Sequence, residues 1–176
     1  MVVNGDLQQF CKLLKRAIRA HNAARSHAKT GPRTKLGHFI NENTLVRVDE
    51  ALEAVRMSRL DAGDNEARQW DQMVDVEGFD AYVTMRVYRN SIIHHNGTLN
   101  EEFYDRRCTH GGLCKATHCG RRKQYLGNYN RFCKKVKVRP RRPGQRLKLP
   151  ATKPDFLQTL IQDVRAFAQN VLTQSG

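Results

Sequence analysis

The chain has 176 residues, long enough for one domain with a substantial hydrophobic core. Its 31 Lys and Arg residues outnumber its 17 Asp and Glu residues, which gives a net charge of +14. The sequence has no run of about 18 apolar residues, so we expect no membrane span. The first residues lack the basic and apolar regions of a secretory signal, and five cysteines, an odd number, do not suggest a disulfide framework. These features favour a cytoplasmic protein.

The excess positive charge is confined to one segment of the chain. Residues 106–149 contain 15 Lys or Arg and no Asp or Glu, whereas the rest of the chain has 16 basic and 17 acidic residues. A block of like charge is often an interaction surface for a polyanion. Nucleic acid is the expected partner. A membrane surface or an acidic protein stays open as an alternative, although the block lacks a basic amphipathic helix.

In the first half of the chain, apolar side chains recur at helical spacing in two segments. The first helix is predicted over residues 6–28. Residues 29–42 contain glycines and a Gly-Pro pair and are predicted to form a loop. A second helix is predicted to begin at Asn43 and to end at a break over residues 61–65. Its apolar face consists of Leu45, Val48, Leu52 and Val55.

The second half also favours helices. Trp70 is predicted to lie on a short helix, and Gly78 permits a bend before the apolar segment 79–95. The clearest helix spans residues 155–172, whose wide apolar face must pack against other helices within the monomer or across a dimer. No alternating α/β pattern occurs. We therefore predict a mainly α protein, one domain over residues 1–176. The expected architecture is an up-and-down bundle of about four or five helices, with residues 106–149 as a basic, Cys-containing insertion before the last helix.

A polar stretch ends the apolar segment 79–95, and it reads Arg89-Asn90-Ser91-Ile92-Ile93-His94-His95-Asn96-Gly97. A guanidinium can hold phosphate oxygens, and an imidazole can move a proton near neutral pH. Asn90 and His94 share one helix face, and Arg89 is long enough to bend toward it. Asn96-Gly97 is typical of a helix C-cap, so the histidines should lie at an accessible helix end. The alternative is a surface helix end whose basic residues only favour the helix dipole.

The pattern Arg89-Asn90-x3-His94, followed by Asn96-Gly97, resembles the Arg-x4-6-His signature of HEPN-domain proteins. Three further segments are similar to parts of that family. They are an acidic-apolar stretch after the motif, a short extended segment and the last helix, at residues 99–103, 144–149 and 155–172. The likeness covers residues 80–105 and 143–174, and the N-terminal helices only in general character.

This resemblance implies a metal-independent endoribonuclease, often a toxin or an antiviral-defence effector, that requires no cofactor for catalysis. The RNA 2′-hydroxyl would be the nucleophile, His94 a general acid or base, and Arg89 would stabilise charge on phosphorus. Asn90 would orient the phosphate or His94. His95 is the alternative to His94, because Arg89-x5-His95 also fits the signature. Motifs of this family commonly face each other across a dimer. A single copy therefore implies a homodimer, with an antitoxin or another regulatory protein as a further partner.

Two other functions stay open. The chain could be a non-catalytic RNA- or DNA-binding protein on a HEPN-like bundle, with the basic segment as its binding surface. It could also be a regulatory or scaffold bundle that binds a protein or nucleotide. A shared fold does not by itself establish activity.

The basic side chains expected to contact nucleic acid are Arg121, Arg122, Lys123, Lys134, Lys135, Lys137, Arg139, Arg141 and Arg142. Tyr125, Tyr129 and Phe132 interleave with them. This mix suits single-stranded nucleic acid, because aromatic rings stack on bases while cations follow the backbone. Alternatively, the aromatic residues form a small core. Residues 132–139 alternate partly between apolar and basic and predict a short β-ribbon.

The same segment contains the candidate zinc ligands Cys108, His110, Cys114, His118, Cys119 and Cys133. Structural zinc takes four tetrahedral nitrogen or sulfur ligands. A short polar segment gains from a metal, because it cannot build its own core. No Cys-x2-Cys pair occurs, however, so the alternative is a set of incidental cysteines in a basic insertion.

Overall fold

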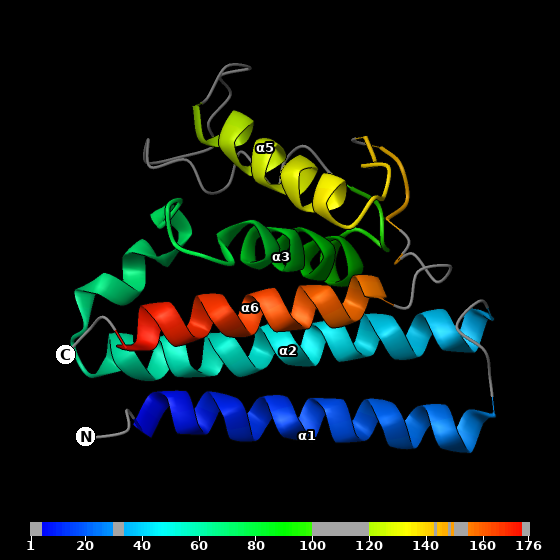
Figure 1. Ribbon diagram of the computed structural model, residues 1–176, viewed down its shortest axis with the longest axis horizontal. Coiled ribbons are helices and arrows are strands. Elements are labelled where there is room, and N and C mark those ends of the chain that lie inside the picture. Colours follow the sequence, from blue (N-terminus) through cyan, green and yellow to red (C-terminus); the bar gives the residue numbers. More distant parts are fainter. Residues whose placement is uncertain are drawn as a thin grey trace.

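The protein folds as a mainly α-helical bundle, shown by the computed structural model in Figure 1. The described residues are 5–29, 34–99, 120–142, 144–147, 149 and 155–173. Their elements are α1 (Gly5–Ala28), α2 (Lys35–Asp61), the 3₁₀ helix η1 (Asn65–Gln72), α3 (Phe79–His94), α5 (Gly120–Lys135) and α6 (Asp155–Thr173). Within this part of the chain, no helix is long and apolar enough to cross a membrane.

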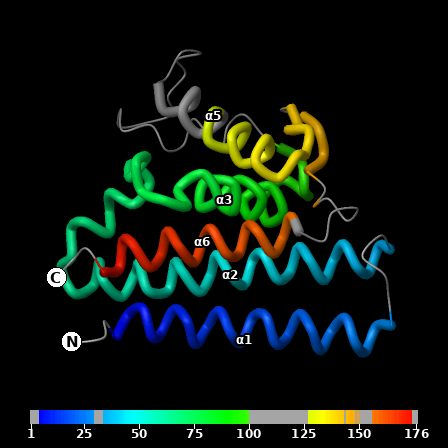
Figure 2. Tube along the Cα trace, viewed as in Figure 1, coloured from blue at the N-terminus to red at the C-terminus, as the bar shows by residue number. Residues whose placement is uncertain are grey.

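The helices are arranged in layers (Figures 1 and 2). Helix α1 lies along α2, and α2 and α6 lie beneath α3, which carries α5 on its other side. Successive helices α1, α2 and α3 run in opposite directions, and α6 runs antiparallel to α3. The predicted mainly α bundle is therefore confirmed, and α5 runs in the same general direction as α3. Helix α3 lies between the other elements, so its side chains contact neighbours on several sides.

Aromatic rings from distant parts of the chain form the centre of this core. Phe167 of α6 stacks on Tyr82 of α3 with ring centroids 4.5 Å apart, and its ring also lies 6.4 Å from Trp70 and 6.0 Å from Phe79. All four side chains are almost completely buried. The apolar face of α6 is thus covered within the monomer. Of the two arrangements that its sequence allowed, packing within the monomer and packing across a dimer, the structure has the first.

Gly78 sets the distance between α3 and α6. It caps the start of α3 with φ +85°, in the left-handed region that favours glycine. A Cβ at this position would collide with the carbonyl oxygen of Asp163 and lie 2.8 Å from the backbone nitrogen of Phe167. The bend expected at Gly78 therefore also allows α6 to approach the chain closely.

The predicted loop over residues 29–42 is wrong in its second part. Helix α2 begins at Lys35 rather than at Asn43, and Thr34 is its N-cap. The Thr34 hydroxyl accepts a hydrogen bond from the Gly37 backbone nitrogen at 3.0 Å, which satisfies a donor that the helix leaves free. Residue 37 is buried inside the helix, where a glycine is tolerated because tertiary packing outweighs its weak helix propensity.

The predicted β-ribbon over residues 132–139 is also wrong. Residues 120–135 form α5, which packs on α3 and buries Tyr129, Phe132 and Cys133 completely or almost so. Tyr129 lies against Tyr88, and Phe132 lies against Phe156 of α6. The partial alternation in the sequence belongs to a helix whose apolar side faces the bundle. From α5 onward, the basic segment therefore contributes side chains to the core, among them the aromatic residues Tyr129 and Phe132.

Candidate functional site at the end of helix α3

Arg89, Asn90 and His94 come together in the last turns of α3. The Arg89 Nη1 donates to Asn90 Oδ1 at 2.9 Å and lies 3.4 Å from His94 Nε2. Asn90 is buried, whereas the His94 side chain is exposed. The expected bend of the Arg89 head toward His94 is therefore present. Asn90 positions the guanidinium rather than the imidazole.

A buried carboxylate from α2 lies beneath this arginine. Asp49 is only 2% exposed, and its Oδ2 lies 3.4 Å from Arg89 Nε. Asp49 also accepts two hydrogen bonds of 3.0 Å from Arg86 Nη1, which donates a third to Glu53 at 2.9 Å. Asp49 thus interacts with two arginines of α3, and one of them, Arg86, also pairs with Glu53. The arrangement restrains the Arg89 stem while its Nη1 faces His94.

Burial and charge act in opposition in this cluster. Burial raises the pKa of Asp49, although the neighbouring Arg86 and Arg89 guanidiniums act to lower it. Burial acts to lower the pKa of Arg86, but the Asp49 carboxylate and other neighbours outweigh it and raise that pKa. The charged forms of Asp49 and Arg86 depend on each other, because either charge would be costly to bury without its partner.

His94 and His95 lie at the end of α3, on the surface of the bundle. The backbone nitrogens of His95 and Gly97 both donate to the Ser91 carbonyl oxygen, at 3.1 and 2.7 Å. Asn96 has φ +48° and Gly97 φ +76°, so the predicted C-cap is confirmed. The His94 and His95 rings lie edge to face with centroids 6.3 Å apart. Either imidazole is therefore close to the same helix end.

A short extended segment pairs with the chain directly after this helix. Thr98 and Arg146 form an isolated antiparallel bridge, with hydrogen bonds from Leu99 to Gln145 and from Leu147 to Gly97 of 2.9 and 2.6 Å. Of the extended segment expected over residues 144–149, the described residues form a turn at Gly144 and Gln145 followed by the bridge at Arg146. It joins the end of the basic segment to the end of α3.

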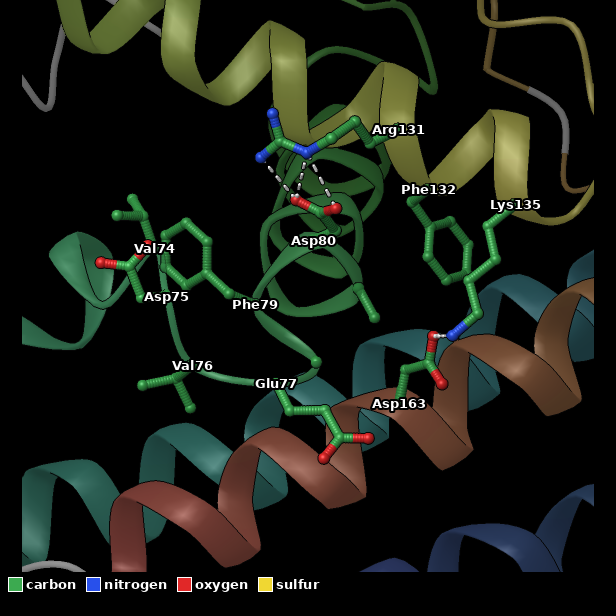
Figure 3. A pocket seen from close by; sticks show the side chains of 12 residues that line it. Val74, Asp75, Val76, Glu77, Phe79, Asp80, Arg131, Phe132, Lys135 and Asp163 are labelled. Atoms are coloured by element: carbon green, nitrogen blue, oxygen red, sulfur yellow. Dashed lines mark hydrogen bonds and ion pairs between the residues drawn. The ribbon is translucent and has the colours of Figure 1, made fainter.

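The predicted nucleic-acid contacts do not form one group. Lys134, Lys137, Arg139, Arg141 and Arg142 are exposed. Lys135 is paired with Asp163 of α6 at 2.5 Å, and it lines a pocket of about 340 Å³ where α3 begins. Figure 3 shows this pair beside a second one, Arg131 with Asp80, in the same pocket. The side chains of Arg121, Arg122 and Lys123 lie outside the described part.

This pocket is separate from the Arg89–His94 pair. Asp80 is in the first turn of α3 and His94 is its last residue, about 20 Å away along the helix axis. Both basic side chains in the pocket are held by carboxylates, so they connect α5 to α3 and α6. Lys135, one of the predicted nucleic-acid contacts, therefore has an ion-pair partner within the bundle.

Five of the six candidate zinc ligands, Cys108, His110, Cys114, His118 and Cys119, lie outside the described residues. Cys133 is inside the core, and burial raises the pKa of its thiol to about 11. A zinc ligand must be a thiolate, which this apolar surrounding disfavours. Among the residues described, no group of three or more possible ligands occurs. The zinc site stays a prediction for the other five residues.

The sequence interpretation overlooked Asp49, Arg86 and Glu53. Asp49 lies between Val48 and Leu52 on the apolar face of α2, and Arg86 lies next to Val87 in the apolar segment of α3. A charged residue within a helical apolar stripe must find a partner, because a buried unpaired charge is costly. Opposite charges on two such stripes were the signal that could have revealed the pair.

Comparisons of the chain with protein-family models, with curated proteins and with solved structures found no match.

Proposed function

We propose that the protein is a metal-independent endoribonuclease of the HEPN type, with its site at the end of α3. The observation that carries the proposal is the Arg89–His94 pair, whose Nη1 and Nε2 atoms are 3.4 Å apart above the buried Asp49. A permanent cation and an imidazole at this spacing suit the two tasks of phosphodiester cleavage. One is to stabilise charge on phosphorus, and the other is to transfer a proton.

The roles of the two residues follow from their donor and acceptor atoms. A guanidinium has no acceptor, so a hydrogen bond in this pair requires an unprotonated His94 Nε2. That nitrogen can take the proton of the RNA 2′-hydroxyl. The 2′-oxygen then forms a bond to phosphorus as the bond from phosphorus to the 5′-oxygen breaks. The 5′-oxygen takes up a proton from water and the protonated His94 releases its proton to solvent, which leaves a 2′,3′-cyclic phosphate and a 5′-hydroxyl.

Asp49 and Asn90 act in this proposal as positioning residues. Asp49 lies beside Arg89 Nε and Asn90 accepts from Arg89 Nη1, so the guanidinium is oriented before substrate binds. Preorganised charge stabilises a transition state more than charge that must rearrange during the reaction. The exposed basic side chains Lys134, Lys137, Arg139, Arg141 and Arg142 would contribute sequence-independent attraction for the RNA.

The test is cleavage of total RNA by the purified protein in EDTA, with the product ends identified. We expect His94→Ala and Arg89→Ala each to lower the cleavage rate by about 10² to 10⁴. His27→Ala and Arg16→Ala, which change exposed residues of α1, are the matched controls and should cleave normally. Full activity of the His94→Ala protein would contradict the assignment, and loss only in His95→Ala would transfer the role to His95. RNA binding without cleavage by the wild-type protein would favour the non-catalytic alternative.

The role of Asp49 is tested with Asp49→Asn, which keeps the size of the side chain. We expect kcat to fall by roughly tenfold with little change in KM, because the interaction with Arg89 matters most in the transition state. Glu53→Gln is the control, since Glu53 pairs with Arg86 and Arg56 and not with Arg89. Thermal unfolding of each variant separates a loss of fold from a loss of positioning. An unchanged kcat in a folded Asp49→Asn protein would exclude the positioning role.

A further inference from the structure

Arg146 lies beside the candidate site without belonging to the motif that predicted it. It is the residue of the extended segment that pairs with Thr98, four residues after His94. A Cβ on Gly97 would be 3.6 Å from Arg146 Nε and 3.8 Å from its Cγ, so the Arg146 side chain runs over the end of α3. Backbone hydrogen bonds on both sides, from Leu99 to Gln145 and from Leu147 to Gly97, hold this register.

The charge environment of Arg146 differs from that of the ion-paired arginines of the bundle. Arg59, Arg86 and Arg131 are each engaged in an ion pair of 3.0 Å or less. Arg146 is exposed, and among the described residues it makes no ion pair. Its guanidinium is therefore accessible to an anion from solution.

Arg146 nevertheless interacts with a carboxylate of α2, so its surroundings contain both signs of charge. Burial raises the pKa of Glu42, and the charges of Arg146 and His38 oppose that rise. Glu42 and Asp49 are seven residues apart on α2, which corresponds to about 10 Å along the helix axis. Arg146 is near the first of these carboxylates and Arg89 contacts the second. The two arginines thus interact with different carboxylates of α2.

We propose that Arg146 is a second phosphate-binding residue of this site, which holds a phosphate next to the one that is cleaved. This inference rests on the proposed ribonuclease function and identifies its substrate as a strand longer than a dinucleotide. One guanidinium lies over Gly97 and the other lies beside His94, so each can hold a different phosphate of one strand. The extended segment that carries Arg146 follows directly after the exposed Arg139, Arg141 and Arg142, so the strand would continue over these residues.

The first experiment compares two substrates. A dinucleoside monophosphate has only the phosphate that is cleaved, whereas a single-stranded decaribonucleotide also has neighbours. We expect Arg146→Gln to lower kcat/KM for the decamer by roughly tenfold, since a charge-assisted hydrogen bond of this kind contributes that much to binding. The same variant should cleave the dinucleotide at the wild-type rate. Arg146→Lys should restore part of the loss because it keeps the charge.

Arg16→Gln is the matched control, because it removes the same charge from an exposed position on α1. It should leave both substrates unaffected. Equal losses of Arg146→Gln on the decamer and the dinucleotide would overturn the proposal, and so would no loss on either. Thermal unfolding confirms that the variants are folded.

A binding experiment separates this inference from the proposed function. Decaribonucleotide affinity is measured against salt concentration in the His94→Ala protein, or in the wild type if the wild type cleaves neither substrate. Loss of one phosphate contact should reduce the slope of log K against log salt by about 0.7. We expect this change for Arg146→Gln and not for Arg16→Gln. Identical slopes for the two variants would reject Arg146 as a phosphate contact, whether or not the protein is a nuclease.

Discussion

The protonation of a single buried polar group depends on what surrounds it, and Cys133 is the clearest example in the core. Its side chain is completely buried next to Tyr129 and Phe132 on α5. Burial raises the pKa of the Cys133 thiol from 9.0 to about 11, opposed by a hydrogen bond with Tyr129. Burial also raises the pKa of Tyr129 itself. The folded protein therefore favours the neutral thiol and phenol, and it resists their deprotonation.

This shift predicts a loss of stability in alkali. Below about pH 9 the Cys133 thiol is protonated in both states. Between about pH 9 and 11 the unfolded chain releases the proton while the folded one retains it, so the free energy of unfolding falls as pH rises. We expect a fall on the order of 1–2 kcal/mol from this residue over that window. Urea unfolding at several pH values should show a shallower fall for Cys133→Ala, and parallel curves for the two proteins would contradict the assignment.

Contacts between elements depend on a few positions where backbones approach closely. Gly78 joins η1 to α3 and lies against the Asp163–Phe167 turn of α6. Gly63, between α2 and η1, has a similar φ of +87° but no heavy atom within 4 Å of a Cβ. The two glycines share the same backbone requirement, and only Gly78 has the additional close contact. Substitution of each glycine therefore separates the cost of the left-handed backbone from the cost of the close contact.

We expect Gly63→Ala to destabilise the protein by about 1 kcal/mol, the cost of a left-handed backbone for an ordinary residue. Gly78→Ala should cost roughly 2 kcal/mol more, because the new methyl group collides with the α6 backbone. Chemical denaturation of the two variants measures the difference directly. Equal losses would show that α6 can move away from Gly78 without cost.

At the scale of the whole molecule, apolar side chains are exposed in two places. Ile93, next to His94, is 45% exposed. Leu36 and Phe39, on the first turns of α2, are 49% and 64% exposed and line a pocket with residues of α1. The apolar face of α6 is covered within the monomer and gives no reason for assembly. The proposed homodimer therefore rests on the single motif copy, and the exposed Ile93 beside His94 offers it a contact.

We expect light scattering at micromolar concentration to show a dimer. If the site is composite, a heterodimer of wild-type and His94→Ala protein is inactive. An equal mixture, after exchange of subunits, should then retain about a quarter of the wild-type activity instead of about half. Monomers that cleave RNA, or an activity proportional to the wild-type fraction, would rule out a site shared between two protomers.

Much of the helical framework could be predicted from the sequence alone. The spans of α1, α3 and α6 follow from apolar residues at helical spacing and from caps such as Gly78 and Asn96-Gly97, which are local features. The proximity of Arg89, Asn90 and His94 is also local, because one helix positions all three. Local spacing along a helix fixes such neighbours before any tertiary contact forms.

Only the tertiary structure decided which side chains support that motif. Asp49 and Arg86 meet because α2 and α3 pack antiparallel, and Arg146 lies over Gly97 because an extended segment returns to the end of α3. The helix over residues 120–135 was also not predictable from its charge pattern, since its apolar side is visible only against α3. Contacts between residues far apart in the chain depend on how whole elements pack, and the spacing within one segment does not by itself determine which neighbours that segment meets.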